Sequence, residues 1–368
     1  MRSDRLLYGV YFMSNKALIF SDIHIHPHKR STERLNDCLT ALDWAFTLAA
    51  DEKINTIFFI GDLFHDRQKI DVLTYQLTFE IFRKHLNERD IKMALLLGNH
   101  DLWHAQKWNV SSVRPLSALP GVEVIDHPCS YSGKHFNLPA KKIGFLPYTH
   151  DPNAHIKEIG SGDVLFAHVA VDDAVWNVRY GVRSEVAVEH DGNMVKVGSD
   201  IFKDWNRVFL GHYHCAQKLS PTVEYVGSPL QLSFGESLEK KYAIVHNFES
   251  GQTEYFLNGF SPQHLIVYAE DIDKHDLTGN FVKIIVDDIG ATDLIDLRKE
   301  LTNKYNPRSL EIIQNPQEKK QHIVEDAKAI LYNQEEMLER YVDEVGTDNL
   351  HREQLLEIGH SIIEECEE

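Results

Sequence analysis

The sequence predicts an α/β fold with a parallel βαβ core, and two observations carry this prediction. Several short apolar runs are bounded by glycine or polar residues, which is typical of strands buried on both faces. Helical patterns separate the first of these runs: "ERLNDCLTALDWAFTLAADEK" (33–53) repeats apolar residues at helical spacing, and a second helix is expected over 70–87. Strand, helix, strand, helix, strand is the pattern of parallel βαβ units.

Further strands are expected in the second half of the core. They are "VEVID" (122–126), "KKIGFLPY" (141–148), "VEYVGSP" (223–229), "KYAIVHNF" (241–248) and "QTEYFLN" (252–258). Few helices separate them, so the pattern favours a second, more antiparallel sheet packed against the first.

The pattern restarts after residue 258 and suggests further parts. We expect a poorly ordered leader (1–13), a core domain (14–260), a small α+β capping domain (261–318) and two amphipathic C-terminal helices (319–368). The expected cap contains three strands and a helix over 293–305. The apolar stripes of the terminal helices suit a partner protein better than the core.

Composition and charge narrow the class of protein. The four cysteines have no CxxC spacing, which favours a reducing cytoplasm over a disulfide scaffold or zinc ribbon. No signal peptide or membrane span is expected. The formal net charge of -18 argues against nucleic-acid binding, but residues 325–368 hold fourteen acids against three bases, which leaves -7 for the rest. The acidity therefore lies mainly in the tail.

Five apolar runs end in residue types that commonly serve as metal ligands. They are "ALIFSDIHIH" (17–26), "TIFFIGDLFHDR" (56–67), "LLLGNHD" (95–101), "DVLFAHV" (163–169) and "RVFLGHYH" (207–214). Open α/β sheets bind ligands at the carboxyl ends of their strands, so these residues are expected to converge. An Asn-His-Asp corner alone can also cap a helix or a turn.

The converging residues suit a dinuclear metal site. The candidates are Asp22, His24, Asp62, Asn99, His168, His212 and His214. Imidazole, carboxylate and amide oxygen without thiolate suit Mn²⁺, Fe²⁺ or Zn²⁺ better than Ca²⁺ or an iron-sulfur cluster. Mn²⁺ is the expected metal, with Mg²⁺, Fe²⁺ or Zn²⁺ as alternatives. Seven ligands exceed the needs of one ion, and two ions suit in-line displacement at phosphorus. Two divalent ions against two carboxylates leave about +2, which attracts a phosphodiester.

These motifs carry a family resemblance. D-x-H (22–24), G-D (61–62), G-N-H-D (98–101), a single histidine (168) and G-H-x-H (211–214), in that order, resemble the calcineurin-like metallophosphoesterases over roughly 17–250. The resemblance implies a two-sheet sandwich flanked by helices. It also implies that Asp62 bridges two ions.

The resemblance assigns the remaining site residues as well. It implies that one ion is held by Asp22, His24 and His214, and the other by Asn99, His168 and His212. It makes His100 the imidazole that stabilises or protonates the leaving oxygen. Asp101 is then expected to orient His100.

Three further features resemble the DNA double-strand-break nuclease subunits of the SbcD type, most of all those of phages. They are "GDLFH" (61–65) and "GSPLQLSFGE" (227–236), together with the order of core, cap and terminal helices. This implies a homodimer in DNA repair and recombination. The terminal helices would bind an SMC-like, SbcC-type ATPase subunit.

Other residues near the motifs have competing interpretations. His26 and His28 are expected in a solvent-facing loop, and His65 near the site but not as a ligand. Four basic residues could contact DNA phosphates or be merely solvated: Lys29, Arg30, Arg67 and Lys69. Glu236 could simply cap a turn.

Three functions compete on this sequence. The leading one, implied by the resemblance, is an Mn²⁺-dependent 3'-5' exonuclease on double-stranded DNA with endonuclease activity on single strands. A small-molecule phosphodiesterase or a protein phosphatase is the second, because a metal centre alone does not choose the ester. A catalytically inactive scaffold is the third, and the retained ligand positions count against it.

Overall fold

The computed structural model describes most of residues 14–314. The exceptions are 28–30, 105–106, 173, 178–181, 184–187, 191–192, 196, 238 and 288, and Arg352 and Leu356 are described in addition. The expected leader and, apart from these two residues, the expected terminal helices lie outside the described residues. No helix in the described part of the chain is long and apolar enough to cross a membrane.

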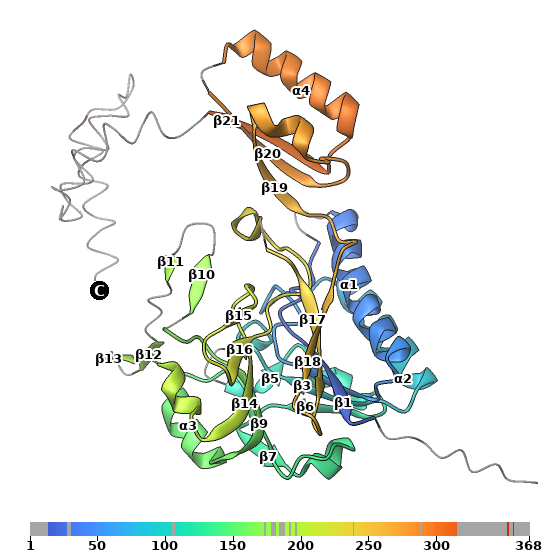
Figure 1. The fold of residues 1–368 in the computed structure, drawn as a ribbon, viewed down its shortest axis with the longest axis vertical. Helices are drawn as coiled ribbons and strands as arrows, with labels where there is room; N and C mark the ends of the chain where they lie inside the picture. Colours follow the sequence, from blue (N-terminus) through green and yellow to red (C-terminus); the bar gives the residue numbers. More distant parts are fainter. Residues whose placement is uncertain are drawn as a thin grey trace, which may run out of the picture. The chain divides into compact units, whose positions relative to one another are not determined.

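Two six-stranded sheets form the core (Figure 1). The first has the order β18 (Thr253–Leu257), β17 (Tyr242–Asn247), β1 (Lys16–Phe20), β2 (Thr56–Phe59), β3 (Lys92–Leu96), β6 (Val122–Ile125). The second has the order β15 (Gln217–Lys218), β16 (Val223–Tyr225), β14 (Trp205–Gly211), β9 (Gly162–His168), β8 (Ile143–Leu146), β7 (Cys129–Tyr131). The expected two-sheet sandwich is confirmed.

The expectation of a more antiparallel second sheet is wrong. In both sheets the central strands pair in parallel and antiparallel pairs lie toward an edge. Moreover, β6, β17 and β18 join the first sheet. The error arose partly because the segment between β8 and β9 contains a helix that the sequence analysis missed, α3 (Pro152–Ile159). Such a crossover is what parallel neighbours require.

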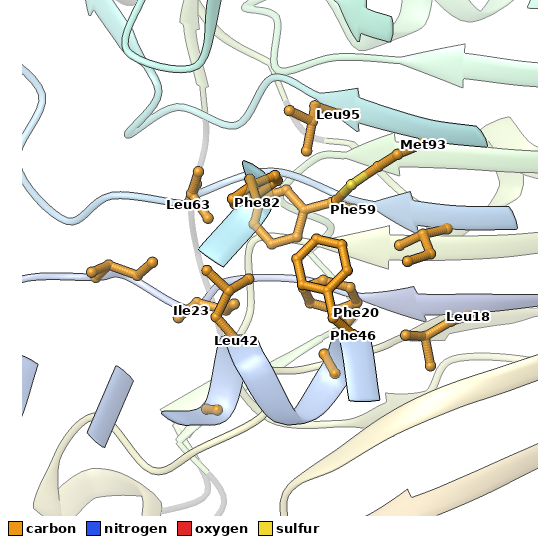
Figure 2. Close-up of a cluster of buried hydrophobic side chains, with 14 of the residues drawn as sticks. Leu18, Phe20, Ile23, Leu42, Phe46, Phe59, Leu63, Phe82, Met93 and Leu95 are labelled. Carbon is orange, nitrogen blue, oxygen red and sulfur yellow. The ribbon is translucent and has the colours of Figure 1, made fainter. Parts of the chain in front are cut away.

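Two long helices cover the outer face of the first sheet. Helix α1 (Thr32–Asp51) begins after the N-cap Ser31, and α2 (Val72–Glu88) begins after the N-cap Asp71. Each cap side chain accepts a hydrogen bond from a backbone N–H of the first turn. Figure 2 shows side chains of β1, β2 and β3 meeting α1 and α2: Leu18, Phe20, Phe59, Met93 and Leu95 pack with Leu42, Phe46 and Phe82.

Alternate residues of the same strands face the second sheet. Ile19, Phe58 and Ala94 belong to a separate buried cluster with Phe166 and Phe209. Because successive side chains of a strand point to opposite faces, each central strand of the first sheet is buried on both sides. This explains the continuous apolar runs, and it rigidly fixes the strand ends.

The remaining elements are smaller. Three hairpins are β4 (Leu102–His104) with β5 (Lys107–Ser111), β10 (Val175–Asn177) with β11 (Val182–Arg183), and β12 (Val188–His190) with β13 (Asn193–Val195). Short 3₁₀ helices are η2 (Arg114–Ala118), η3 (Gly133–Phe136), η4 (Ser199–Phe202), η5 (Phe234–Glu236) and η6 (Ala269–Lys274).

The C-terminal described part contains a three-stranded sheet. Its order is β19 (His264–Tyr268), β20 (Phe281–Val286), β21 (Ser309–Gln314), and α4 (Ala291–Tyr305) lies between the last two strands in the chain. The chain divides into two compact units, residues 1–284 with 296–311 and residues 285–295 with 312–368. The boundaries of a separate capping domain stay a prediction.

Candidate metal centre

The candidate ligands lie at the carboxyl ends of five central strands. They are Asp22 and His24 after β1, Asp62 after β2, Asn99 after β3, His168 at the end of β9, and His212 and His214 after β14. The first three strands belong to the first sheet and the last two to the second. The site therefore lies where the carboxyl ends of the central strands of both sheets come together.

An unusual backbone shapes these strand ends. Asp22, His24, Asp62 and His212 have positive φ angles of 54°, 50°, 59° and 107°. Such conformations are costly for residues with a side chain and cluster at functional sites. Hydrogen bonds between adjacent loops hold them, because the N–H groups of Asp22 and His24 donate to the carbonyl oxygens of Gly61 (3.0 Å) and Asp62 (3.2 Å).

Gly98 is required by the close approach of two loops. A Cβ atom at this position would lie 2.6 Å from the backbone nitrogen of Asp62 and 2.7 Å from Cε1 of His168. Both distances are well below van der Waals contact. The glycine therefore lets the loop after β3 approach Asp62 and His168 directly.

The candidate ligands form two clusters. Asp22, His24 and His214 form one, and Asp62, His168 and His212 form the other; within each cluster the potential ligand atoms lie within 4.8 Å of one another. Asp62 faces both clusters. Its Oδ2 atom lies 3.5 Å from His24 Nε2 and 3.4 Å from His168 Nε2.

Several contacts inside the clusters suit cations. The Nε2 atoms of His24 and His214 are only 3.1 Å apart. The inner edge of the Asn99 amide lies 3.1 Å from His212 Nδ1 and 3.2 Å from His168 Nε2. In the orientation that satisfies both ends of the amide, its nitrogen lies on this edge and its oxygen accepts from Arg67 Nη2 (2.7 Å). A half-turn of the amide would bring the oxygen to this edge beside the two imidazoles, and these donors are the types that Mn²⁺, Fe²⁺ and Zn²⁺ accept. The residues present therefore fit a pair of divalent ions.

The pKa shifts in the metal-free site also indicate a place for positive charge. Burial lowers the pKa of His168, but the charge of Asp62, its hydrogen bond to the ring and the charge of Asp22 together outweigh burial and raise this pKa to about 9. Burial also lowers the pKa of His212 to about 3 and that of His24 well below its usual value. Without metal, a proton on His168 thus supplies the positive charge that Asp62 requires.

Hydrogen bonds to groups outside the clusters orient two of the imidazole rings. His168 Nδ1 donates to the carbonyl oxygen of Ile60 (2.7 Å), and His214 Nδ1 donates to Glu236 Oε1 (3.1 Å). In each ring the Nε2 atom is left facing the cluster, as is usual for metal-binding histidines. The sequence analysis missed the contact of Glu236 with His214, although it identified the segment "GSPLQLSFGE".

The expected role of Asp101 in orienting His100 stays a prediction, and the contacts of Asp101 show a different direct role. Its buried carboxylate does not contact the ring of His100, whose Nδ1 lies 2.5 Å from the carbonyl oxygen of His65. It accepts three backbone hydrogen bonds instead, from Asp62 (2.8 Å), Leu63 (3.0 Å) and Gly98 (2.8 Å). An acceptor-only carboxylate fits this corner, where three N–H groups from two loops converge. Asp101 therefore joins the loops that carry Asp62 and Asn99.

Other predicted residues surround the clusters. The ring of His65 stacks on those of His26 (centroids 4.4 Å apart) and His100 (5.5 Å). Arg67 is exposed, and its Nη2 lies 2.7 Å from the outer edge of the Asn99 amide. Lys69 is exposed. His28, Lys29 and Arg30 lie outside the described residues.

Several known proteins are similar to much of this chain. The model of the calcineurin-like phosphoesterase family matches residues 16–216. Exonuclease subunit 1 of Enterobacteria phage T4 is 24% identical over 239 residues, which cover 64% of this chain and 66% of that protein. The SbcD subunit of nuclease SbcCD is 24% identical over 270 residues in Bacillus subtilis (64% and 67% covered) and 25% over 261 residues in Staphylococcus saprophyticus (66% and 68%). The matches thus span about two thirds of each relative.

Proposed function

This chain belongs to the calcineurin-like phosphoesterase family, and we propose that it is a dinuclear-metal DNA nuclease that processes DNA ends in repair and recombination. The proposed activities are 3'-5' exonuclease on double-stranded DNA and endonuclease on single strands. The names of the relatives, a phage exonuclease subunit and two SbcCD nuclease subunits, support DNA as the substrate.

One observation carries the proposal: Asp62 belongs to one cluster of potential ligands, beside His168 (3.4 Å), and its Oδ2 atom also lies 3.5 Å from His24 of the other cluster. Asp22, His24 and His214 would hold one ion, Asn99, His168 and His212 the other, and Asp62 would bridge them. Bound ions would activate a water as nucleophile and offset charge on the phosphoryl oxygens. Two divalent ions against the carboxylates of Asp22 and Asp62 leave about +2, which attracts a phosphodiester despite the acidic chain.

His100 is the proposed residue for the leaving oxygen. Its Nδ1 donates to the carbonyl oxygen of His65, which leaves Nε2 to face a substrate. That atom can stabilise the leaving oxygen or give it a proton. The backbone N–H of His100 donates to Asp62 Oδ1 (2.7 Å), so the position of this imidazole follows that of the proposed bridging carboxylate.

Substrate contacts and partners complete the proposal. Arg67, beside Asn99, is the proposed contact for a DNA phosphate, and Lys69 with residues 29–30 would extend it. We further propose Mn²⁺ as the metal, a homodimer, and an SbcC-type ATPase subunit bound by residues 319–368. The subunit names of the relatives support such an assembly.

The test is cleavage of end-labelled linear duplex DNA by the purified chain with Mn²⁺, Mg²⁺ or EDTA. Bis-p-nitrophenyl phosphate serves as a generic diester. His100→Ala should abolish cleavage, whereas His127→Ala, at an exposed histidine beside Asp126, should retain it. Cleavage of the generic diester alone, also in the presence of an ATPase partner, would favour a small-molecule enzyme. Turnover of neither substrate would favour a scaffold.

A further inference from the structure

A buried group of charges lies directly behind one candidate ligand, His214. The ammonium of Lys241 contacts the carboxylates of Glu236 (2.6 Å) and Glu239 (2.7 Å). The side chain of Lys241 is 5% exposed and each carboxylate side chain is 9% exposed. Removing such charges from water is expensive and often stabilises a fold less than apolar packing would. Their presence therefore calls for a role beyond stability.

These charges hold His214 at both its ring and its backbone. Glu236 accepts the Nδ1–H of the ring (3.1 Å), while Lys241 Nζ donates to the carbonyl oxygen of His214 (2.9 Å). The N–H of Ser228 donates to the same carbonyl oxygen (3.0 Å). The position and the tautomer of the imidazole are thus fixed together.

Further hydrogen bonds hold Glu236 and Glu239 themselves in place. Glu236 Oε2 accepts from the backbone N–H of Leu232 (3.1 Å), so the carboxylate cannot rotate freely. The carbonyl oxygen of Glu239 accepts from Gln231 Nε2 (2.9 Å), and Gln231 Oε1 accepts from the N–H of His264 in β19 (2.6 Å). The segment behind His214 is therefore a rigid support.

The candidate ligand histidines differ in what their outer ring nitrogen contacts. The outer ring nitrogen of His168, in the second cluster, donates to an uncharged carbonyl group. The outer nitrogen of His24, in the first cluster, is buried without a hydrogen-bond partner. Among these three described histidines, His214 is the one whose outer nitrogen meets a carboxylate.

We infer that Glu236 and Lys241 are positioning residues that fix His214 and raise the affinity of the Asp22–His24–His214 cluster for its ion. A carboxylate on the outer nitrogen increases the donor strength of an imidazole and holds it in the binding orientation. The contact with Lys241 (2.6 Å) helps to hold the Glu236 carboxylate against the ring. The inference rests on the proposed metal function of this site.

The experiment is calorimetric titration of the metal-free, full-length chain with Mn²⁺, supported by the electron paramagnetic resonance spectrum of bound Mn²⁺. The variant Glu236→Gln retains shape and a hydrogen-bond acceptor but removes the charge. The matched control is Glu224→Gln, because Glu224 is also buried and pairs with Arg207 and Tyr255 instead of a candidate ligand.

The wild-type chain should bind two ions. Glu236→Gln should weaken one of them about 10- to 100-fold and convert the spin-coupled spectrum into that of a single ion at limiting Mn²⁺. Glu224→Gln should bind both ions like the wild type. Lys241→Met should act in the same direction as Glu236→Gln.

Three results would overturn the inference: two unchanged affinities in Glu236→Gln, an equal loss in Glu224→Gln, or no Mn²⁺ binding by the wild type. The last result would also contradict the proposed function. A wild-type chain that binds two ions, with the expected loss in Glu236→Gln, but leaves DNA intact would contradict the nuclease and sustain the inference.

Discussion

Asp101→Asn tests whether this carboxylate joins two loops of the site. In the wild type, one oxygen accepts from the N–H groups of Asp62 and Gly98 and the other from that of Leu63. An amide replaces one oxygen with a donor, so at least one buried N–H loses its acceptor, at a cost of about 1 to 3 kcal/mol. The remaining bonds become weaker because the acceptor is neutral.

The net loss of stability in Asp101→Asn is smaller than the lost and weakened hydrogen bonds suggest. Burial and the charge of Asp62 raise the pKa of Asp101 to about 7, so the amide also removes a repulsion. We therefore expect a loss of about 2 kcal/mol in the free energy of unfolding at pH 8, where the carboxylate is ionised. Hydrolysis of a generic diester should fall as well, because the loops carrying Asp62 and Asn99 share this anchor.

Urea unfolding of the metal-free chain, followed by circular dichroism, measures the effect. The matched control is Asp71→Asn, whose exposed carboxylate accepts the backbone N–H of Thr74 (2.9 Å) at the start of α2. This control should lose about 1 kcal/mol or less and retain full activity. If Asp101→Asn unfolds within about 0.5 kcal/mol of wild type yet loses activity, the carboxylate does not join the loops and the alternative role, orientation of His100, regains support.

Three further outcomes are expected. Gly98→Ala should lower Mn²⁺ affinity at least tenfold, because its Cβ would collide with Asp62 and His168; an unchanged calorimetric titration would contradict this. Mn²⁺ at a hundred times its Kd should raise the free energy of unfolding by about 2.7 kcal/mol per ion, and a Tm that is the same in EDTA would refute it. In metal-free protein burial lowers the pKa of His168, but the charge of Asp62, its hydrogen bond to the ring and the charge of Asp22 together raise it to about 9 from 6.5. The stabilisation from this pair is therefore complete below pH 6.5 and is lost as the pH rises through 9, so Tm should fall over this range, and a similar fall in His168→Asn would count against the pair.

The sequence alone predicted the central strands and the residues at their carboxyl ends. Runs such as 17–20 and 57–60 are apolar without interruption because alternate residues face α1 and α2 on one side and the second sheet on the other. This burial on both faces is visible locally, as is the change to polar residues where each strand ends. The order of the motifs then led to the family, which the match over 16–216 shows.

The tertiary structure decided which strands are neighbours and what the supporting carboxylates contact. In the first sheet β1 pairs with β17, so that Lys16 lies opposite Asn247. No local pattern encodes a pairing across such a separation, because the hydrophobic period specifies the buried face of a strand and not its partner. Likewise, the residue types at 101 and 236 do not reveal their partners. Asp101 joins two loops and Glu236 orients His214 because folding brings an N–H group that is distant in sequence, from Asp62 or His214, within reach of each carboxylate.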